Sequence, residues 1–260
     1  MASALALTFH GVTADLLPSG LREVPSILRY TLSPQTLTWI LNRIRPESCS
    51  TGAGMASVPG GESVVLTFDD GFRSDYEVVF KALIARRLKA TFFVTTGNVG
   101  REGYVTWDQL QEMASAGMEI GSHGLTHRNL LSLGSDEARG EVRCSKEALE
   151  GRLGTSVVSF APVGGHYERW MVEEAWSSGY RVFASMVPGR TTLRPGTMFM
   201  RRNFVQAHHG AGHLGRLLRG DRLTLLGGRV RYELLRASRR IIGLKRYQRV
   251  RSFVLRKPVS

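Results

Sequence analysis

An apolar run that ends directly in two acidic residues constrains the fold of this chain more than any other feature. Residues 64–68 are apolar or β-branched, which predicts a buried strand, and Asp69, Asp70 and Gly71 follow at once. Two adjacent carboxylates at a buried strand end stay charged only if a cation or hydrogen bonds compensate them. A metal ion would do so, with one Asp as a ligand and the other acting on an activated water. An exposed Asp-Asp-Gly turn is the alternative.

A pair of histidines about fifty residues later favours the metal. His123 and His127 are four residues apart, and residues 120–123 have the pattern of a second strand end. This spacing can bring two imidazoles to one cation. With a carboxylate they would give two nitrogens, one oxygen and an open position, which is typical of a catalytic zinc site. Two surface histidines would give the same pattern by themselves.

Residues 67–71 (TFDDG) and 123–127 (HGLTH) together resemble the polysaccharide deacetylases, carbohydrate esterase family 4, which includes chitooligosaccharide deacetylase-like enzymes. The resemblance covers about residues 4 to 205, and residues 90–94, 104–108 and 160–165 also fit. It implies an α/β fold, a distorted (β/α)7 barrel. It also implies a metal-dependent hydrolase that removes N-acetyl groups from hexosamines of a polysaccharide or lipid-linked glycan, in exopolysaccharide or cell-envelope biosynthesis. The implied cofactor is a divalent metal, Zn2+ first, with Co2+, Mn2+ or Ni2+ as alternatives.

The resemblance assigns roles to the four motif residues. In the family the first Asp is the general base, and the second Asp binds the metal with the two histidines. Asp69 is therefore expected to be the base, with Asp70, His123 and His127 as metal ligands.

The general acid of the family is usually a histidine near the end of the domain. Here the late histidines 208, 209 and 213 lie in a glycine-rich stretch that predicts a loop. Residues 5–9 instead form an apolar strand that ends at His10. This looks like the circularly permuted, exopolysaccharide-deacetylase-like subgroup, in which the last strand has moved to the front, and it implies His10 as the acid. A histidine that merely caps the strand is the alternative.

Three residues are candidates for substrate or oxyanion contacts. The family's Arg before Pro162 and its Asp-Trp motif are missing, and Val163 replaces the usual aromatic residue. The Val163 N–H could still bind an oxyanion, since that contact needs no side chain. Arg202 is expected to orient the base or bind substrate, unless it is a surface residue. Trp107 is expected to stack on a sugar ring, or else to pack at a helix start.

Strand-like and helix-like segments alternate along the chain, which predicts a parallel sheet. Strands are expected near residues 4–9, 63–68, 90–95, 118–122, 157–161, 180–184 and 198–205, and helices near 34–45, 74–88, 106–117, 135–153 and 167–178. We expect a catalytic barrel over residues 1–211, with motifs in 62–205 and strand 4–10 completing it. Residues 46–62, rich in Gly, Ser and Pro, are expected to form a flexible loop near the site or a linker. Cys49 and Cys144 are expected to be free thiols.

Residues 212–260 are expected to form a basic helical tail. They hold 14 Lys or Arg and 2 Asp or Glu, a net charge of +12 out of +13 for the chain. Apolar residues recur at helical spacing among the arginines: Val230, Leu234, Leu235, Ile241, Ile242 and Leu244. Such a helix would lie on an anionic membrane, or pack its apolar stripe on the barrel. Charge alone permits nucleic-acid binding, but no recognition motif supports it, so no nucleic acid is expected.

The N-terminal residues lack the basic segment of a signal peptide, and no apolar stretch is long enough to span a membrane. We therefore expect a cytoplasmic protein with a peripheral membrane contact through the tail. A Ser or Cys nucleophile is disfavoured, since no G-x-S-x-G motif occurs. Two alternatives to N-deacetylation remain open. The first is removal of an O-acetyl or formyl group, and the second is a degenerate barrel that binds glycan or membrane without turnover.

Overall fold

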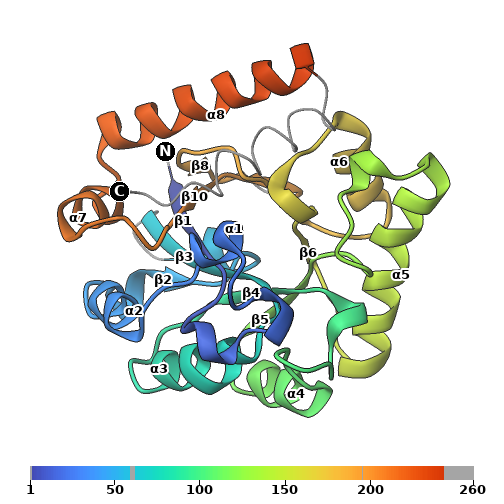
Figure 1. Cartoon of the computed structure of the whole chain (residues 1–260), viewed down its shortest axis with the longest axis horizontal. Helices are drawn as coiled ribbons and strands as arrows, with labels where there is room; N and C mark the ends of the chain where they lie inside the picture. Colours follow the sequence, from blue (N-terminus) through green and yellow to red (C-terminus); the bar gives the residue numbers. More distant parts are fainter. Residues whose placement is uncertain (1, 59–61, 195, 243–260) are drawn as a thin grey trace.

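The computed structural model describes residues 2–58, 62–194 and 196–242 and is built around one sheet (Figure 1). Its strands are β1 (Ser3–Phe9), β2 (Cys49–Ser50), β3 (Glu62–Asp70), β4 (Thr91–Val94), β5 (Glu119–Ser122), β6 (Ser159–Phe160), β7 (Val182–Ala184), β8 (Thr191–Thr192), β9 (Met198–Met200) and β10 (Arg202–Phe204). The main path runs β10-β1-β3-β4-β5-β6-β7-β9, and neighbours along it are parallel. The short β2 and β8 pair with β3 and β1 outside this path.

The two ends of the sheet meet in one extended segment. Only Arg201 separates β9 from β10, and β9 pairs with β7 whereas β10 pairs with β1. Residues 198–204 therefore bridge both edges and nearly close the sheet into a barrel of seven parallel segments. This arrangement confirms the predicted distorted (β/α)7 barrel.

Helices cover the outside of the barrel. They are α1 (Pro25–Leu28), α2 (Pro34–Leu41), α3 (Lys81–Ile84), α4 (Trp107–Ser115), α5 (Ser135–Leu153), α6 (Arg169–Ser177), α7 (Ala211–Leu218) and α8 (Arg222–Ile242), and a π-helical turn, Asp75–Phe80, leads into α3. Figure 1 shows α2 to α6 around the strands. Local signals set their ends: the Ser33 hydroxyl accepts from the Thr36 N–H, Thr106 forms a capping box with Gln109, and Gly154 ends α5 in a left-handed conformation.

Side chains alternate between two cores. Along β1, Leu5, Leu7 and Phe9 join the main cluster beneath the helices, whereas Ala4 and Ala6 join a smaller cluster inside the barrel. The inner cluster uses small residues and flexible methionines such as Met200, which fit a narrow space. Both predicted thiols are free, Cys49 being buried and Cys144 exposed.

The segment predicted as a loop near the site lies at the other end of the barrel. β2 pairs with the first half of β3. The Gly52 N–H donates to the Thr91 hydroxyl, and the Ala53 N–H donates to the Glu119 carboxylate. Thr91 and Glu119 begin their strands, so this segment covers the amino ends of the strands. The expectation that it lies near the site is wrong as far as residues 46–58 and 62 are concerned, and residues 59–61 lie outside the described residues.

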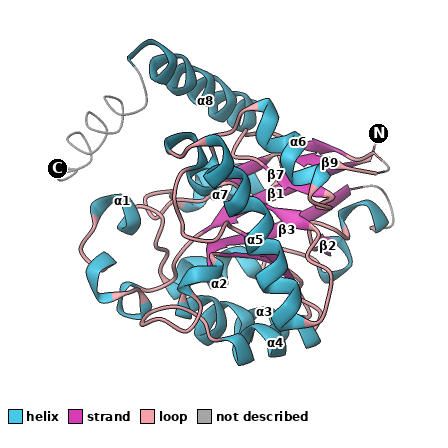
Figure 2. Ribbon diagram, turned by 90° about the vertical axis from the view of Figure 1, so that its right-hand side faces the viewer, coloured by secondary structure: helices cyan, strands magenta, loops and turns pink. Residues whose placement is uncertain are grey.

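The basic tail begins with a helix that packs on the barrel. Leu214 and Leu217 of α7 are buried in the main core cluster, and α7 begins at Ala211, within residues 207–213 that were expected to form a loop. α8 then runs along the periphery of the barrel (Figures 1 and 2). The division into barrel 1–211 and tail 212–260 stays a prediction, and residues 243–260 lie outside the described residues.

The apolar stripe of α8 faces away from the barrel. Five side chains on it are 50% to 83% exposed: Leu223, Leu226, Val230, Leu234 and Ile241. The barrel side of the helix carries Leu225, which packs on the main core, and half-buried polar residues such as Tyr232 and Arg236. The expectation that the stripe packs on the barrel is therefore wrong. Among the described residues, no helix combines the length and apolarity needed to cross a membrane.

Candidate metal centre and active site

The carboxyl ends of β3 and β5 bring three possible metal ligands together. Ligand atoms of Asp70, His123 and His127 all lie within 4.8 Å of one another. The Asp70 Oδ1 atom is 2.9 Å from the Nε2 atom of His127 and 3.4 Å from that of His123. Asp70 and His127 both have positive φ angles, 82° and 61°, which non-glycine residues rarely adopt. Such strained residues concentrate at functional sites.

The orientation of His123 fits a metal ligand. Its Nδ1 atom lies 2.8 Å from the carbonyl oxygen of Ala161 at the end of β6. A carbonyl only accepts, so Nδ1 carries a proton, and Nε2, which faces Asp70, is the nitrogen that would bind a cation once it is unprotonated. This second contact is the usual partner of a metal-binding histidine. The donors present therefore fit a divalent cation.

The loop that carries His127 is held by a buried carboxylate from α5. Glu141 accepts hydrogen bonds from the N–H groups of Leu125 and Thr126, at 2.7 and 2.9 Å, and from the Thr126 hydroxyl. Gly124 opens the loop at φ 83°. The His127 side chain is 39% exposed, so the cluster opens to solvent on its side.

Electrostatics couple Asp70 to the histidines. Burial raises the pKa of Asp70, but His127 and hydrogen bonds from both histidines outweigh it and hold the pKa well below its usual range. Burial lowers the pKa of His127, but the charge and hydrogen bond of Asp70 raise it above the usual value. The carboxylate is thus charged and ready to hold a cation.

Asp69, beside this cluster, is held by Arg202 from β10. Arg202 is fully buried, and its Nη1 and Nη2 atoms donate to Oδ1 and Oδ2 of Asp69 at 2.6 and 3.0 Å. Its Nε atom donates to the Ser185 carbonyl, and its guanidinium lies 5.0 Å from the ring centroid of Phe93. The surface alternative for Arg202 is wrong. This arginine fixes the Asp69 carboxylate, although the family's usual arginine before Pro162 is missing.

His10 reaches the same end of the barrel. Phe9 of β1 pairs with Phe68 of β3. The next residue on each side, His10 and Asp69, therefore lies at the same end of the barrel, next to the other. The His10 ring lies 5.1 Å from the Tyr30 ring. Burial lowers the pKa of His10 more than Asp70 and Asp69 raise it.

The late histidines form a separate group. The ring centroids of His208 and His209 are 4.8 Å apart, and those of His209 and His213 are 4.2 Å apart. Burial and the neighbouring histidines lower the pKa of His209 to about 4.

The remaining candidates lie at the rim or in the helix layer. Val163 starts a short turn, Val163–Gly165, directly after Pro162 at the end of β6. Trp107 packs against the main core cluster, with the Arg152 guanidinium 5.5 Å from its ring centroid. Its place in the helix layer supports the packing alternative.

Sequence reasoning missed two buried acids near the cluster. Glu141 resembles the surface charges of its helix, and Asp75 follows the first motif in a polar stretch. Asp75 is fully buried, and burial together with the charges of Asp70 and Asp69 raises its pKa well above the usual value. Its position five residues after a strand-end motif was the one available signal.

The fold and this cluster define a distorted α/β barrel with a candidate metal centre at the carboxyl ends of its strands. The chain belongs to the polysaccharide deacetylase family, whose model matches residues 56–183. The protein of Bacillus subtilis (strain 168) named "Putative polysaccharide deacetylase YxkH" is 28% identical over 170 residues, which are 65% of this chain and 58% of that protein. This chain thus matches little more than half the length of that relative.

Solved structures share the fold. The Streptococcus pyogenes deacetylase PplD in complex with acetate superposes with a TM-score of 0.71 at 22% identity, over 84% of this chain and 97% of that one. IcaB from Ammonifex degensii gives a TM-score of 0.67 at 22% identity, with the same coverage of 84% and 97%. These likenesses agree with the barrel described above.

Proposed function

We propose that this protein is a metal-dependent deacetylase that hydrolyses N-acetyl groups of hexosamine residues in a polysaccharide or a lipid-linked glycan. The main support is the cluster of Asp70, His123 and His127. Beside it lies Asp69, a buried carboxylate that accepts two hydrogen bonds from an arginine. Family membership supports the same reaction class. The family's permuted subgroup would account for the position of β1, with its His10, between β3 and β10.

Asp70, His123 and His127 would hold the metal, with Zn2+ the first choice for this donor set. A bound divalent cation lowers the pKa of a water molecule and polarises an acyl carbonyl. Both oxygens of Asp69 are engaged by Arg202, yet each keeps a lone pair that can accept a proton from the attacking water. Asp69 is the proposed general base, and Arg202 fixes the plane of its carboxylate.

His10 is the proposed general acid. It lies at the same barrel end as Asp69 and would donate a proton to the leaving amine, without which an amide bond does not break at neutral pH. The backbone N–H of Val163 is the proposed donor to the oxyanion of the tetrahedral intermediate.

Acetate release from N-acetylglucosamine oligomers tests the proposal, with Zn2+-loaded protein beside a chelated control. Metal-dependent release is expected. Asp69→Asn should bind the same amount of metal and lose at least about 10²-fold in turnover. If that variant kept most of its activity, the base assignment would be wrong. Protein that binds metal but releases acetate from no oligomer would be assayed with O-acetyl and formyl sugars, and failure there would leave a non-catalytic glycan-binding role.

We also propose that the outer face of α8 rests on an anionic membrane surface. Its exposed apolar residues, such as Leu226 and Leu234, lie beside the exposed Arg222 and Arg231. Residues 243–260 add six Lys or Arg and no acidic residue. Apolar burial together with cationic charge is the combination that binds anionic lipid.

Cosedimentation with phosphatidylglycerol-containing and pure phosphatidylcholine vesicles tests the membrane contact. Leu234→Glu and Ala237→Glu add the same charge to the exposed face, but only the first removes a large apolar group. Leu234→Glu should weaken binding to anionic vesicles roughly tenfold more than Ala237→Glu. Equal effects, or dimers seen by light scattering without lipid, would assign the face to another partner.

A further inference from the structure

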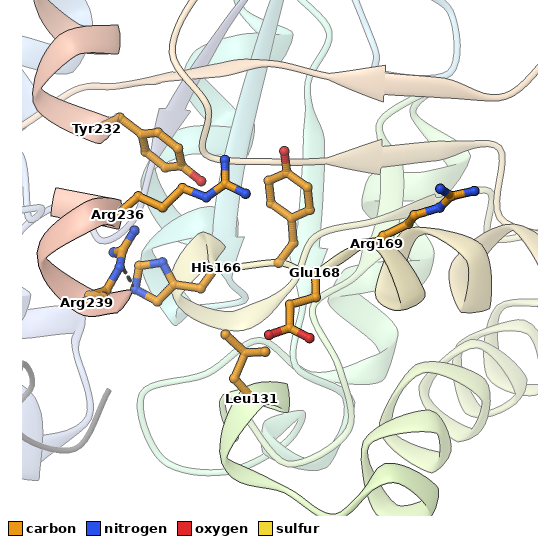
Figure 3. A pocket seen from close by; sticks show the side chains of 8 residues that line it. Leu131, His166, Glu168, Arg169, Tyr232, Arg236 and Arg239 are labelled. Carbon is orange, nitrogen blue, oxygen red and sulfur yellow. Dashed lines mark hydrogen bonds between the residues drawn. The ribbon is translucent and has the colours of Figure 1, made fainter. Parts of the chain in front are cut away.

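A cavity lies between α8 and the loop that follows β6 (Figure 3). Its volume is about 510 Å³, which is in the range of small-molecule sites. The residues that matter for its chemistry are His166, Tyr167, Glu168, Tyr232, Arg236 and Arg239. α8 contributes the last three, so the basic tail forms one wall.

The cavity shares its loops with the candidate catalytic residues. Residue 131, which lines it, follows the loop that carries His127, and residues 166–168 follow Val163. Gly165, at φ 67°, packs so closely on Met186 that a Cβ atom would lie 1.9 Å from its Cγ atom. This contact fixes the path of the loop into the cavity. These shared loops are the path along which a glycan bound at the metal centre would extend toward the cavity.

Cationic charge prevails on the α8 wall. The Arg236 guanidinium points into the cavity in Figure 3, and its ion pair with Glu233 spans 3.7 Å, whereas Glu233 pairs more closely with Arg229 at 3.0 Å. Arg239 lies beside it, with its Nη1 atom 2.9 Å from His166 Nε2. A guanidinium binds a carboxylate or a phosphate through two parallel hydrogen bonds, which suits an oxyanion.

Among the described residues that line the cavity, Glu168 is the only carboxylate and Arg169 is a third arginine. Glu168 accepts a hydrogen bond from the Trp170 indole at 3.1 Å. Arg169 pairs with Glu173 at 2.7 Å and points away from the cavity in Figure 3. Its side chain is almost fully exposed. Arg169 is therefore a matched control, since it borders the cavity without facing it.

Two tyrosines complete a surface for a sugar ring. Tyr167 is backed by Phe199, with ring centroids 5.0 Å apart. Burial, followed by the nearby Tyr167, raises the pKa of Tyr232, so its hydroxyl stays protonated and can donate. Aromatic faces and hydroxyl donors beside an arginine suit a sugar that carries an acidic group.

We infer that this cavity is a subsite for an acidic unit of the glycan, a sugar bearing a carboxylate or a phosphate, whose oxyanion binds Arg236. The inference rests on the proposed deacetylase function, which places an N-acetylated sugar of the same glycan at the metal centre. The substrate class becomes an anionic N-acetylated glycan.

Calorimetric binding to metal-loaded Asp69→Asn protein tests the subsite. The probes are a neutral N-acetylglucosamine tetramer, a hyaluronan tetrasaccharide as the carboxylate, and an N-acetylglucosamine oligomer with a 1-phosphate. At least one acidic probe should bind about tenfold or more tightly than the neutral tetramer. The preference should vanish in Arg236→Gln, persist in part in Arg236→Lys and remain complete in Arg169→Gln. The probe with the larger preference identifies the anion.

Equal affinities for the three probes, or an Arg236→Gln effect of the same size on all of them, would overturn the subsite. Thermal melting of each variant separates loss of fold from loss of the anion contact. Acetate release by the wild-type protein, measured on the same probes, separates this inference from the proposed function. Release without acidic preference overturns the subsite alone, whereas Arg236-dependent binding without any release overturns the deacetylase and leaves the anion site.

Discussion

Arg202 donates two hydrogen bonds, of 2.6 and 3.0 Å, to the Asp69 carboxylate, although the two residues are 133 positions apart in the chain. Both side chains are buried, and the guanidinium is held in turn by the Ser185 carbonyl and the Thr67 hydroxyl. A carboxylate fixed in this way cannot rotate away from the metal cluster next to it. The pair therefore makes Asp69 a preorganised group.

Replacing Arg202 should slow turnover more than it weakens substrate binding. Lysine keeps the charge, but one ammonium cannot hold both oxygens of Asp69 in a plane. For Arg202→Lys we expect kcat to fall about 10²-fold with KM little changed, because a small misplacement of the base is enough. Arg201→Lys, one residue away, is the control. Metal content and melting temperature are measured alongside, and an unchanged kcat in folded Arg202→Lys protein would remove the positioning role.

This pair also marks a limit of prediction from sequence. Asp70, His123 and His127 could be predicted to meet, because each follows a recognisable strand and parallel strands end at one edge. For Arg202, the sequence leaves orientation of Asp69, substrate binding and a surface position all open, because the choice among them depends on how residues 198–204 close the barrel. A buried arginine and a surface arginine have the same sequence pattern.

His10 should matter in proportion to the basicity of the leaving group. An amine must be protonated as it leaves, whereas 4-nitrophenolate leaves without a proton. His10→Asn should lower N-deacetylation by about 10²–10⁴-fold and slow hydrolysis of 4-nitrophenyl acetate far less. His213→Asn serves as the histidine control. Equal losses on both substrates would show that His10 shapes the site rather than supplying a proton.

Glu141 should control metal affinity through the loop of His127. Its carboxylate holds the N–H groups of Leu125 and Thr126, so Glu141→Ala frees the loop. We expect metal affinity to fall about 10–100-fold, as for other groups that support metal ligands. Glu141→Gln should lose less, because its amide oxygen still accepts both N–H bonds and its NH2 can donate to the Thr126 hydroxyl. The exposed Glu147→Ala on the same helix is the control, and competition with a chelating dye gives the affinities. A wild-type affinity in Glu141→Ala would show that the loop holds its shape without this carboxylate.

Helices show the same contrast between local pattern and tertiary context. Helix α5 could be predicted near residues 135–153 from its start at Ser135, Asp136 and Glu137, and the structure has it at Ser135–Leu153. The start of helix α7 could not, because the glycine-rich residues 207–213 predict a loop, and a glycine inside a helix costs about 1 kcal/mol. Burial of its leucines outweighs that cost. The stripe of α8 predicts an amphipathic helix, but a pattern alone does not say which face the protein covers.

Asp75 should make the metal-free protein less stable as the pH rises. Its pKa is raised well above the usual value by burial first and by Asp70 and Asp69 next. The unfolded chain, with an ordinary pKa of about 3.9, therefore loses this proton before the folded protein does. Stability linked to Asp75 is complete below the unfolded pKa and is lost as the pH rises toward the folded one. Asp75→Asn removes this pH-dependent loss of stability. In the presence of chelator at pH 8, we expect the variant to be more stable than the wild type by at least about 1 kcal/mol. The basis is that each pKa unit corresponds to about 1.4 kcal/mol. Urea unfolding from pH 5 to 8.5 measures the difference, with the exposed Asp15→Asn as control. A difference that stayed constant or shrank with rising pH would mean that the Asp75 carboxyl is already charged in the folded protein.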